Sequence, residues 1–388
     1  MSTSVQKKSV TPGQRLLLRR LWSQGPASRS ELAEACDLRR SDVTRLSGEL
    51  IEAGLVREGR SEVAGRGRPR VPLQINGETG RVVGVTLEPG LAGVGVLDLL
   101  GRPAERPRYH RDTEPARLIE AAASMVREAV DASVKRVGIS AAGLLDEGGR
   151  RLLVSAVTPG GAGVSLASVF DAAGDVPVIA QNDMHALTAQ WLLARRIDEK
   201  EDVLVVQLRD GSIGAALIVD GRPNHGSVLG GNELGHTRLP VETDKCFCGS
   251  RGCLERVFST AYLRRLDPGG DDLATRAARF AAADPPLQRV IDLLAMAVSN
   301  AVNFVRPSRL VIVSPFTRHT AFADALVRRI RSGTLEALVQ RLRIDRWDET
   351  ETDHTDRAGW LALADLFLEG WNPAEASGSN GANGANGA

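Results

Sequence analysis

Cysteine, net charge and long apolar stretches are all scarce in this sequence of 388 residues. No run of eighteen apolar residues occurs, so no membrane-spanning helix is predicted. The opening residues MSTSVQKKSV carry no apolar segment after their lysines, so we expect no export signal and a cytoplasmic protein. Apolar residues still make up 43% of the chain, which is ample for globular cores and argues against a disordered or fibrous protein. A chain of this length should form two or three domains.

The formal net charge of +1 hides an uneven distribution along the chain. Residues 1–75 contain 14 Lys+Arg and 8 Asp+Glu, a difference of +6, which leaves −5 for the remaining residues. A basic first segment joined to a mildly acidic body is typical of a nucleic-acid-binding domain fused to a domain that does not bind nucleic acid.

Residues 1–75 have the pattern of a winged helix-turn-helix. A first helix should end at Gly25-Pro26, and Ser28 with Glu31 forms a capping box for a second helix. A third helix would bury its apolar face and expose Arg40, Ser41, Thr44 and Arg45, which are suited to reading the major groove of double-stranded DNA. A small helical bundle with a solvated basic face is the alternative.

Two short apolar strands follow this helix around a tip rich in glycine and arginine. Arg66-Gly67-Arg68-Pro69 in this tip has the composition of segments that lay arginines into a narrow minor groove. Alone, such a run could equally be a basic linker, but its place after a recognition helix favours a wing in which Arg66 and Arg68 contact DNA. Cys36, isolated within this region, is predicted to be a small buried apolar residue.

The other three cysteines lie in one eight-residue window. Cys246, Cys248 and Cys253 follow His236, and imidazole with thiolates forms the set of ligands that a tetrahedral zinc ion prefers. A disulfide and plain burial are the alternatives. The odd number of thiols and the polar turn rich in Gly, Ser and Arg argue against both. We therefore predict a Cys3His site for Zn2+, with a zinc loop over 236–253.

Strands and helices mix from residue 80 onward. Two Val- and Gly-rich hairpins, at 81–102 and 203–222, share a Gly-Arg pair at their ends and suggest two lobes built alike. Helices are expected at 116–132, from about 185, at 287–304, 321–331 and 358–370, and strands at 136–140, 176–180 and 310–313. We predict an α/β fold in each lobe and a disordered tail at 376–388.

Asn182 and Asp183 follow a predicted buried strand, where α/β sheets usually carry ligand groups. Asp183 could act as a general base or accept a hydrogen bond from a ligand. The alternative is that both residues only cap the helix that follows.

Two motifs resemble those of the ROK family of repressors, open reading frames and kinases: E-x-G-H at Glu233 to His236 and C-x-C-G-x-x-G-C-x-E at Cys246 to Glu255. The resemblance implies a two-lobed ribonuclease-H-like, actin-like fold over residues 76–375, preceded by the winged helix-turn-helix of residues 1–75. It also implies sugar binding between the lobes by five polar residues, which are Asn182, Asp183, Glu233, His236 and Glu255.

The phosphate-binding motifs of ROK kinases are matched poorly by this sequence. Where the kinases carry D-x-G-G-T, this chain has Thr86-Leu87-Glu88-Pro89-Gly90, and Pro89 removes a backbone donor. The second phosphate element survives better, as Asp210-Gly211-Ser212, whereas Ser314-Pro315 replaces a later Gly pair.

We therefore expect no enzyme, with Asp183 a vestigial base. The expected protein is a ROK-type transcriptional regulator, more specifically a repressor. It would act as a homodimer or homotetramer on operator DNA and respond to a sugar or sugar derivative. An ATP-dependent sugar kinase with an accessory DNA-binding head is the alternative.

Overall fold

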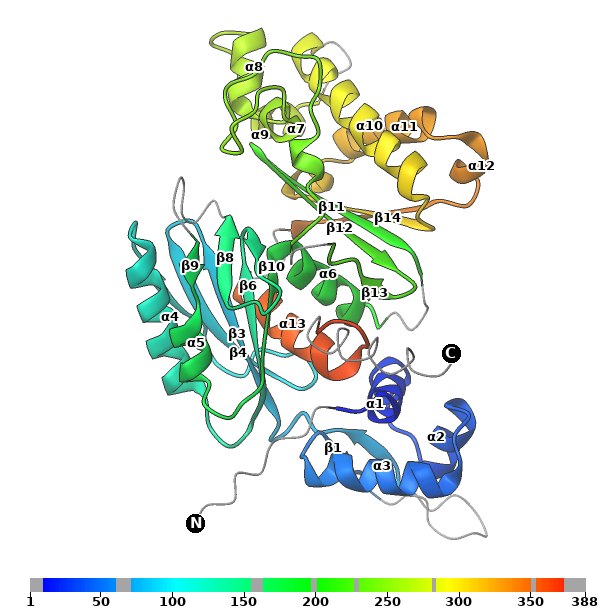
Figure 1. Ribbon diagram of the computed structural model, residues 1–388. Helices are drawn as coiled ribbons and strands as arrows, with labels where there is room; N and C mark the ends of the chain where they lie inside the picture. Colours follow the sequence, from blue (N-terminus) through cyan, green and yellow to red (C-terminus); the bar gives the residue numbers. More distant parts are fainter. Residues whose placement is uncertain are drawn as a thin grey trace, which may run out of the picture. The chain divides into compact units, whose positions relative to one another are not determined.

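The computed structural model describes residues 10–60, 71–154, 163–196, 201–226, 230–280, 284–349 and 354–372. The chain forms two compact units (Figure 1). The first unit comprises Met1–Glu199, Ser227–Gly230 and His354–Ala388, and the second comprises Lys200–Gly226 and Gly231–Asp353. The tail predicted at 376–388 lies outside the described residues. No helix of the described part is long and apolar enough to cross a membrane.

The first unit begins with three helices and a two-stranded antiparallel ribbon, which we call the head. Its elements are α1 (Pro12–Gln24), α2 (Arg29–Ala35), α3 (Arg40–Glu52), β1 (Val56–Glu58) and β2 (Leu73–Ile75). Ser28 and Glu31 form the predicted capping box at the start of α2, and Thr11 with Gln14 forms another at α1. Leucines from α1, α2 and α3 fill the core of the head, including Leu17, Leu32 and Leu50. This is the predicted winged helix-turn-helix.

Cys36 differs from its prediction. It is half-buried rather than buried. It is the C-cap of α2, and its sulfur lies 4.0 Å from the carbonyl oxygen of Leu16.

The remainder of the first unit is a five-stranded sheet with helices on both faces. The sheet order is β10-β6-β3-β4-β5, in which β3 pairs antiparallel with β4 and parallel with β6. Its strands are β3 (Arg81–Glu88), β4 (Leu91–Asp98), β5 (Arg108–Arg111), β6 (Val134–Ala141) and β10 (Val178–Asn182). Helices α4 (Pro115–Ala129) and α5 (Ala167–Ala172) cover one face, and α6 (Asp183–Ala194) and α13 (His354–Phe367) lie on the other (Figure 1). A small sheet of β7 (Leu144–Leu145), β8 (Arg151–Val154) and β9 (Val164–Ser165) was not predicted.

The second unit repeats this sheet topology. Its order is β13-β12-β11-β14-β15, with β11 antiparallel to β12 and parallel to β14. The strands are β11 (Val203–Arg209), β12 (Ser212–Val219), β13 (Arg222–Pro223), β14 (Arg309–Val313) and β15 (Arg343–Trp347). The expectation of two lobes built alike is therefore correct in its strand pairing.

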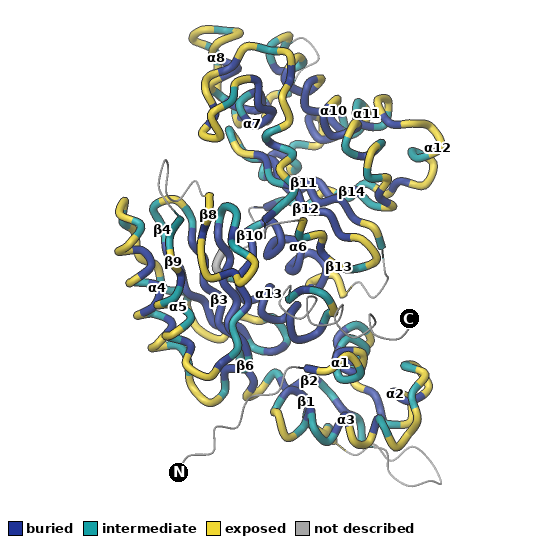
Figure 2. The backbone as a smooth tube through the Cα atoms, viewed as in Figure 1, coloured by how far each residue is buried: buried dark blue, intermediate teal, exposed yellow. Residues whose placement is uncertain are grey.

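Helices of the second unit build a large apolar core against this sheet. They are η1 (Leu234–His236), α7 (Leu254–Val257), α8 (Thr260–Leu266), α9 (Leu273–Ala278), α10 (Pro285–Val305), η2 (Pro315–Arg318), α11 (Thr320–Gly333) and α12 (Glu336–Val339). Most predicted helices differ from the observed ones by one to four residues at their ends, as in α4 and α13. Figure 2 shows that burial is concentrated in the strands, in α6 and in α13.

Candidate metal site and nucleic-acid interface

His236, Cys246, Cys248 and Cys253 come together in the second unit, as the spacing predicts. Their ligand atoms all lie within 4.8 Å of one another. His236 ends η1 and Cys253 is the N-cap of α7, while Cys246 and Cys248 lie on the loop between them. Gly252 must be glycine for this loop to close, because its φ is +81° and a Cβ would lie 2.5 Å from the carbonyl oxygen of Leu239.

The spacing of these atoms fits a tetrahedral ion. Bonds of about 2.3 Å to sulfur and about 2.0–2.1 Å to nitrogen place neighbouring ligand atoms roughly 3.5–3.8 Å apart. The Cys246 Sγ lies 3.6 Å from His236 Nδ1, and the Cys248 and Cys253 sulfurs also lie 3.6 Å apart. Both distances match a tetrahedral site, so these four residues could hold zinc.

Carboxylates surround the cluster. Glu233 Oε2 lies 3.5 Å from Nε2 of His236, so the ring nitrogen turned away from the sulfurs faces an acceptor, as is usual for a metal-bound histidine. The Cys246 thiol donates a 2.9 Å hydrogen bond to Glu255. Burial, and then this hydrogen bond, raise the pKa of the Cys246 thiol to about 12. A bound cation would supply the charge that removes such a proton.

The loop is braced by residues that the sequence did not single out. Thr243 is buried, and its hydroxyl accepts a hydrogen bond from the Gly252 N–H at 2.8 Å. Arg251 donates to the Thr243 carbonyl oxygen at 2.9 Å. A lone Thr ahead of a cysteine window gives no signal of this role in the sequence.

Asn182 and Asp183 lie in the first unit, at the end of β10 and the start of α6. Asn182 caps α6, because its side chain accepts a hydrogen bond from Met184 N at 2.8 Å and donates to Gly143 O at 2.8 Å. The capping role is therefore observed for Asn182, and ligand binding by Asn182 and Asp183 stays a prediction. One amide N–H and one lone pair of Asn182 are left over for a ligand, and Asp183 is half-buried beside it. Glu233, His236 and Glu255, the other candidate sugar-binding residues, belong to the second unit.

The turns that correspond to kinase phosphate loops are used for folding contacts. Pro89 and Gly90 form the two-residue turn between β3 and β4, and Gly90 has a φ of +74°. In the second unit, the Gly211 N–H donates to the carbonyl oxygen of Phe258 at 2.9 Å, and Asp210 accepts from the Thr260 N–H at 2.7 Å. The second element is therefore less available to a phosphate than its sequence suggested.

The exposed face of α3 carries the residues predicted to read DNA. Arg40, Ser41, Thr44 and Arg45 are all exposed, whereas Val43, Leu46 and Leu50 are buried in the head. Arg45 forms a 2.9 Å ion pair with Glu49, and the Thr44 hydroxyl donates to the Arg40 carbonyl oxygen at 2.8 Å. Among the described residues, no side-chain partner lies beside Arg40. The predicted wing residues Arg66 and Arg68 lie outside the described residues.

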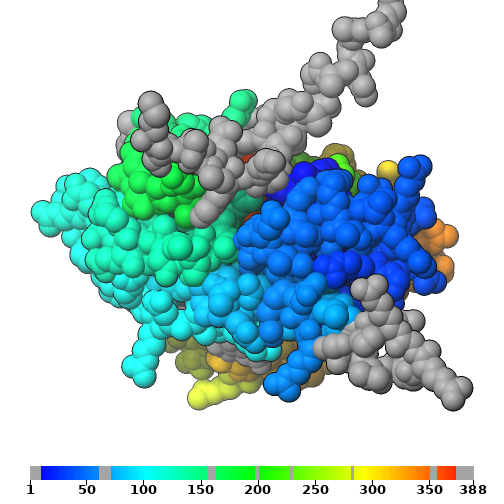
Figure 3. All heavy atoms as spheres, turned by 90° about the horizontal axis from the view of Figure 1, so that it is seen from below, coloured from blue at the N-terminus to red at the C-terminus, as the bar shows by residue number. Residues whose placement is uncertain are grey.

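Arg39 is a further cation on this face that the sequence analysis missed. It is exposed at the N-cap of α3 and, within the described residues, has no ion pair. Its place directly before Arg40, at the start of the predicted third helix, was the available signal. In Figure 3 the residues of the head form one continuous blue surface.

Comparisons with known proteins agree with this architecture. The sequence matches the ROK family over residues 92–369 and the MarR family over residues 10–66. It is 27% identical over 254 residues to the DNA-binding transcriptional repressor Mlc of Escherichia coli, covering 62% of this chain and 61% of Mlc. It is 23% identical over 365 residues to the DNA-binding transcriptional dual regulator NagC of Escherichia coli, covering 87% of this chain and 88% of NagC. The chain thus covers less than two thirds of Mlc.

Solved structures share the fold. A ROK family transcriptional regulator, a homologue of Escherichia coli Mlc, superimposes with a TM-score of 0.73 at 22% identity and covers 93% of this chain and 99% of its own. A ROK family glucokinase from Streptomyces griseus, solved with glucose and AMPPNP, gives a TM-score of 0.57 at 20% identity, covering 73% of this chain and 99% of the glucokinase. The predicted fold, a winged helix followed by a ROK domain, is confirmed. Because the ROK match spans well over half of its length, the chain belongs to the ROK family.

Proposed function

We propose that this protein is a DNA-binding transcriptional repressor that responds to a sugar or sugar derivative. The observation that carries the proposal is the exposed basic face of α3, on a winged helix joined to a ROK domain. In that domain, Pro89 removes one backbone donor from the β3–β4 turn. Arg39, Arg40, Ser41, Thr44 and Arg45 would contact the major groove. The relatives Mlc and NagC, both DNA-binding transcriptional regulators by name, support this assignment.

The effector would bind through Asn182, Asp183, Glu233, His236 and Glu255. Each buried sugar hydroxyl needs a hydrogen-bonding partner, and these carboxylates, the amide and the imidazole supply such partners. His236 would hold Zn2+ through Nδ1, together with Cys246, Cys248 and Cys253. The zinc would be structural, because its four protein ligands leave no open position for a reacting group.

Helix α6 offers a direct connection from the proposed effector residues to the head. It begins at Asp183, and the carbonyl oxygen of Leu193 in its last turn accepts a 3.0 Å hydrogen bond from the indole N–H of Trp22 in α1. α6 is buried over most of its length, so it should move as a rigid body. We propose that sugar binding at Asn182 and Asp183 shifts α6 and, through Trp22, the head.

The repressor would work as a homodimer or homotetramer. Two heads must fit half-sites about 34–36 Å apart, or a multiple of that distance. A shift of each head would spoil this fit and lower the affinity for the operator. A kinase is the weaker alternative, because phosphoryl transfer depends on positioned donors and metal ligands. The Gly211 N–H, one such donor, is hydrogen-bonded to the carbonyl oxygen of Phe258.

A thermal-melt screen tests the sugar half of the proposal. Sugars, amino sugars, phosphosugars and short oligosaccharides are added with and without Mg·ATP, and one-site binding at a hundred times Kd should stabilise the protein by about 2.7 kcal/mol, a shift of a few degrees. We expect one class of sugar to raise Tm and ATP to leave it unchanged. Stabilisation by ATP, or turnover of ATP in the presence of the sugar, would favour a kinase instead.

A further inference from the structure

A pocket lies within the first unit where the head meets the five-stranded sheet and its helices, which we call the sheet domain. None of its lining residues is assigned to DNA, sugar or zinc. Its volume is about 320 Å³, which falls at the small end of the range of roughly 300–1,000 Å³ that is usual for ligand pockets. The head supplies part of its lining through α1, β1 and β2. The loops that follow α1, β2 and β4 supply most of the rest, together with Arg196, two residues past the end of α6.

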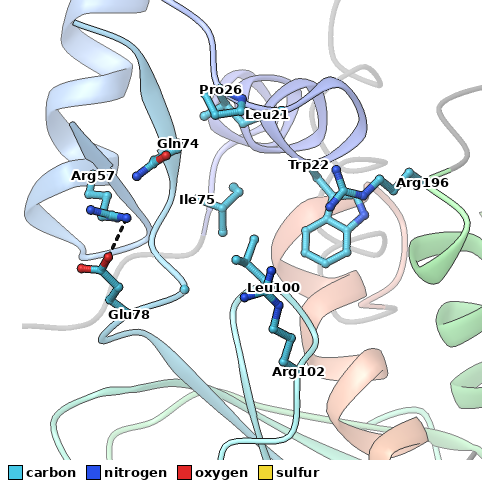
Figure 4. A pocket seen from close by; sticks show the side chains of 12 residues that line it. Leu21, Trp22, Pro26, Arg57, Gln74, Ile75, Glu78, Leu100, Arg102 and Arg196 are labelled. Atoms are coloured by element: carbon cyan, nitrogen blue, oxygen red, sulfur yellow. Dashed lines mark ion pairs between the residues drawn. The ribbon is translucent and has the colours of Figure 1, made fainter. Parts of the chain in front are cut away.

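The middle of the pocket is apolar. Leu21, Trp22 and Ile75 come from the head, and Leu100 faces them from the loop after β4 (Figure 4). Trp22 is held in one orientation, because its indole N–H donates to Leu193 and its ring packs against neighbouring aromatic rings at centroid distances of 5.2 and 5.9 Å. A rigid aromatic wall of this kind suits a flat ligand.

The rim of the pocket is cationic. Arg57 is neutralised by a 2.7 Å ion pair with Glu78. Arg102 and Arg196 are both exposed, and no carboxylate of the described residues pairs with either of them. The Arg196 guanidinium lies 5.9 Å from the centroid of the Trp22 ring. Two uncompensated guanidinium groups beside an apolar wall would attract a ligand that carries negative charge.

We propose that this pocket binds a small organic anion with a flat apolar body, its ring against Trp22 and Ile75 and its charged group between Arg102 and Arg196. The apolar wall distinguishes the site from a contact for DNA phosphate, which would use the arginines and leave Leu21, Ile75 and Leu100 unmatched. Bound there, the ligand would touch both the head and the sheet domain and hold them together. This inference goes beyond the proposed function and does not depend on the sugar site.

The test uses 8-anilinonaphthalene-1-sulfonate, an aromatic sulfonate that fluoresces on binding, titrated into the full chain. We expect saturable binding at one site per chain. Replacing both cations, in an Arg102→Ala and Arg196→Ala double variant, should raise the Kd for the sulfonate by about tenfold or more, because the sulfonate loses two charged donors. Arg106 and Arg328 are exposed arginines away from the pocket, so the Arg106→Ala and Arg328→Ala double variant is the matched control and should bind as the unsubstituted protein does.

A second variant tests the apolar wall. Leu100→Trp adds a bulky ring to a half-buried position in the pocket and should abolish saturable binding while the melting temperature stays within a few degrees. 1-Anilinonaphthalene, which lacks the sulfonate, should bind at least about tenfold more weakly than the sulfonate to the unsubstituted chain. The proposal is overturned if the sulfonate fails to bind at one site, or if the double pocket variant binds it as tightly as the control.

Discussion

The cluster of His236, Cys246, Cys248 and Cys253 shows how single residues set the local structure of the second unit. Cys246 and Cys253 are buried, at 2% and 0% exposure, and the ligand atoms of all four residues lie within 4.8 Å of one another. Close packing of thiols adds little to the free energy of folding, whereas binding of a divalent ion by thiolates adds a large amount. The cluster could therefore hold a metal ion, which is the basis of the proposed zinc site.

Replacing Cys253 by Ser should remove the metal and destabilise the protein. Binding free energy of a structural zinc is folding free energy, so we expect Tm to fall by several degrees or more. Elemental analysis should find one zinc per chain in the unsubstituted protein and none in the variant. Cys36→Ser is the matched control, because Cys36 is half-buried and lies outside the cluster, and it should keep both its zinc and its Tm. A variant Cys253→Ser that retains zinc would contradict the assignment.

Arg39 and Arg40 permit a second prediction at the scale of residues. Replacing both by Ala should weaken operator binding about tenfold or more, because each substitution removes a charged group that would bind a base edge or a phosphate. Where the arginine binds a phosphate, its removal should also lower the slope of log K against log salt by about one. Fluorescence anisotropy at several salt concentrations measures both quantities. Arg106→Ala, on the surface of the sheet domain, should change neither the affinity nor the salt slope. Equal operator affinity of the unsubstituted protein, the double variant and Arg106→Ala would contradict the proposed interface.

At the scale of elements, α1 is bonded to helices of the sheet domain near their carboxyl ends. Trp22 donates to Leu193 of α6, and Arg15 donates to the carbonyl oxygen of Asp365 in α13 at 3.2 Å. The head therefore adds side-chain donors near the carboxyl ends of both helices; the Leu193 carbonyl oxygen also accepts from the Arg196 N–H. The buried Asp365 also forms a 2.7 Å ion pair with Arg136 of β6.

Trp22→Phe tests whether the connection between α6 and the head carries the signal. Phenylalanine keeps an aromatic ring in place but removes the indole donor to the Leu193 carbonyl oxygen, which still accepts from the Arg196 N–H at 3.0 Å. The free energy of unfolding should therefore fall by about 0.5–1.5 kcal/mol, the net contribution of one hydrogen bond. The variant should bind the operator when sugar is absent and respond less to sugar. Urea unfolding and operator titrations with and without sugar measure these effects.

Trp371→Phe provides the control for this variant. Trp371 is fully buried, and its indole nitrogen has no hydrogen-bond partner in the described part of the chain, so the same substitution there removes a ring without removing such a bond. Its response to sugar should be unchanged. If both variants respond to sugar as the unsubstituted protein does, α6 does not transmit the signal through Trp22.

At the scale of the whole molecule, the fold class could be predicted from the sequence because the signals for it lie between residues that are close together in the chain. Ser28 with Glu31 predicted the start of α2, and the Cys246 to Glu255 motif predicted a cluster that closes over a short loop. The like pairing of the two sheets followed from two similar hairpins. Small strands such as β7 were not predicted, because two or three residues carry too little periodicity to signal a strand.

Contacts between distant segments could not be predicted. Nothing in the sequence shows that Trp22 meets Leu193, or that Gly211 gives its N–H to Phe258, because these pairs form only once the sheets have brought the segments together. The pocket beside Trp22 is lined by five separate segments of the chain, which meet only in the folded protein. Asn182 illustrates a different limit: residues of its type cap helices and bind ligands equally well, and the sequence left both roles open.

The most direct test of a sugar-responsive repressor is operator affinity with and without a sugar that raises Tm in the thermal screen. Operator DNA selected from a random pool is titrated by anisotropy at fixed salt, with Glu233→Ala measured in parallel and Glu242→Ala, an exposed glutamate outside the cluster, as its control. We predict that saturating sugar raises the operator Kd by about tenfold or more, a coupling free energy near 1.4 kcal/mol. Glu233→Ala should lose this response and Glu242→Ala should keep it. An operator Kd that stays the same at saturating sugar would contradict the central claim.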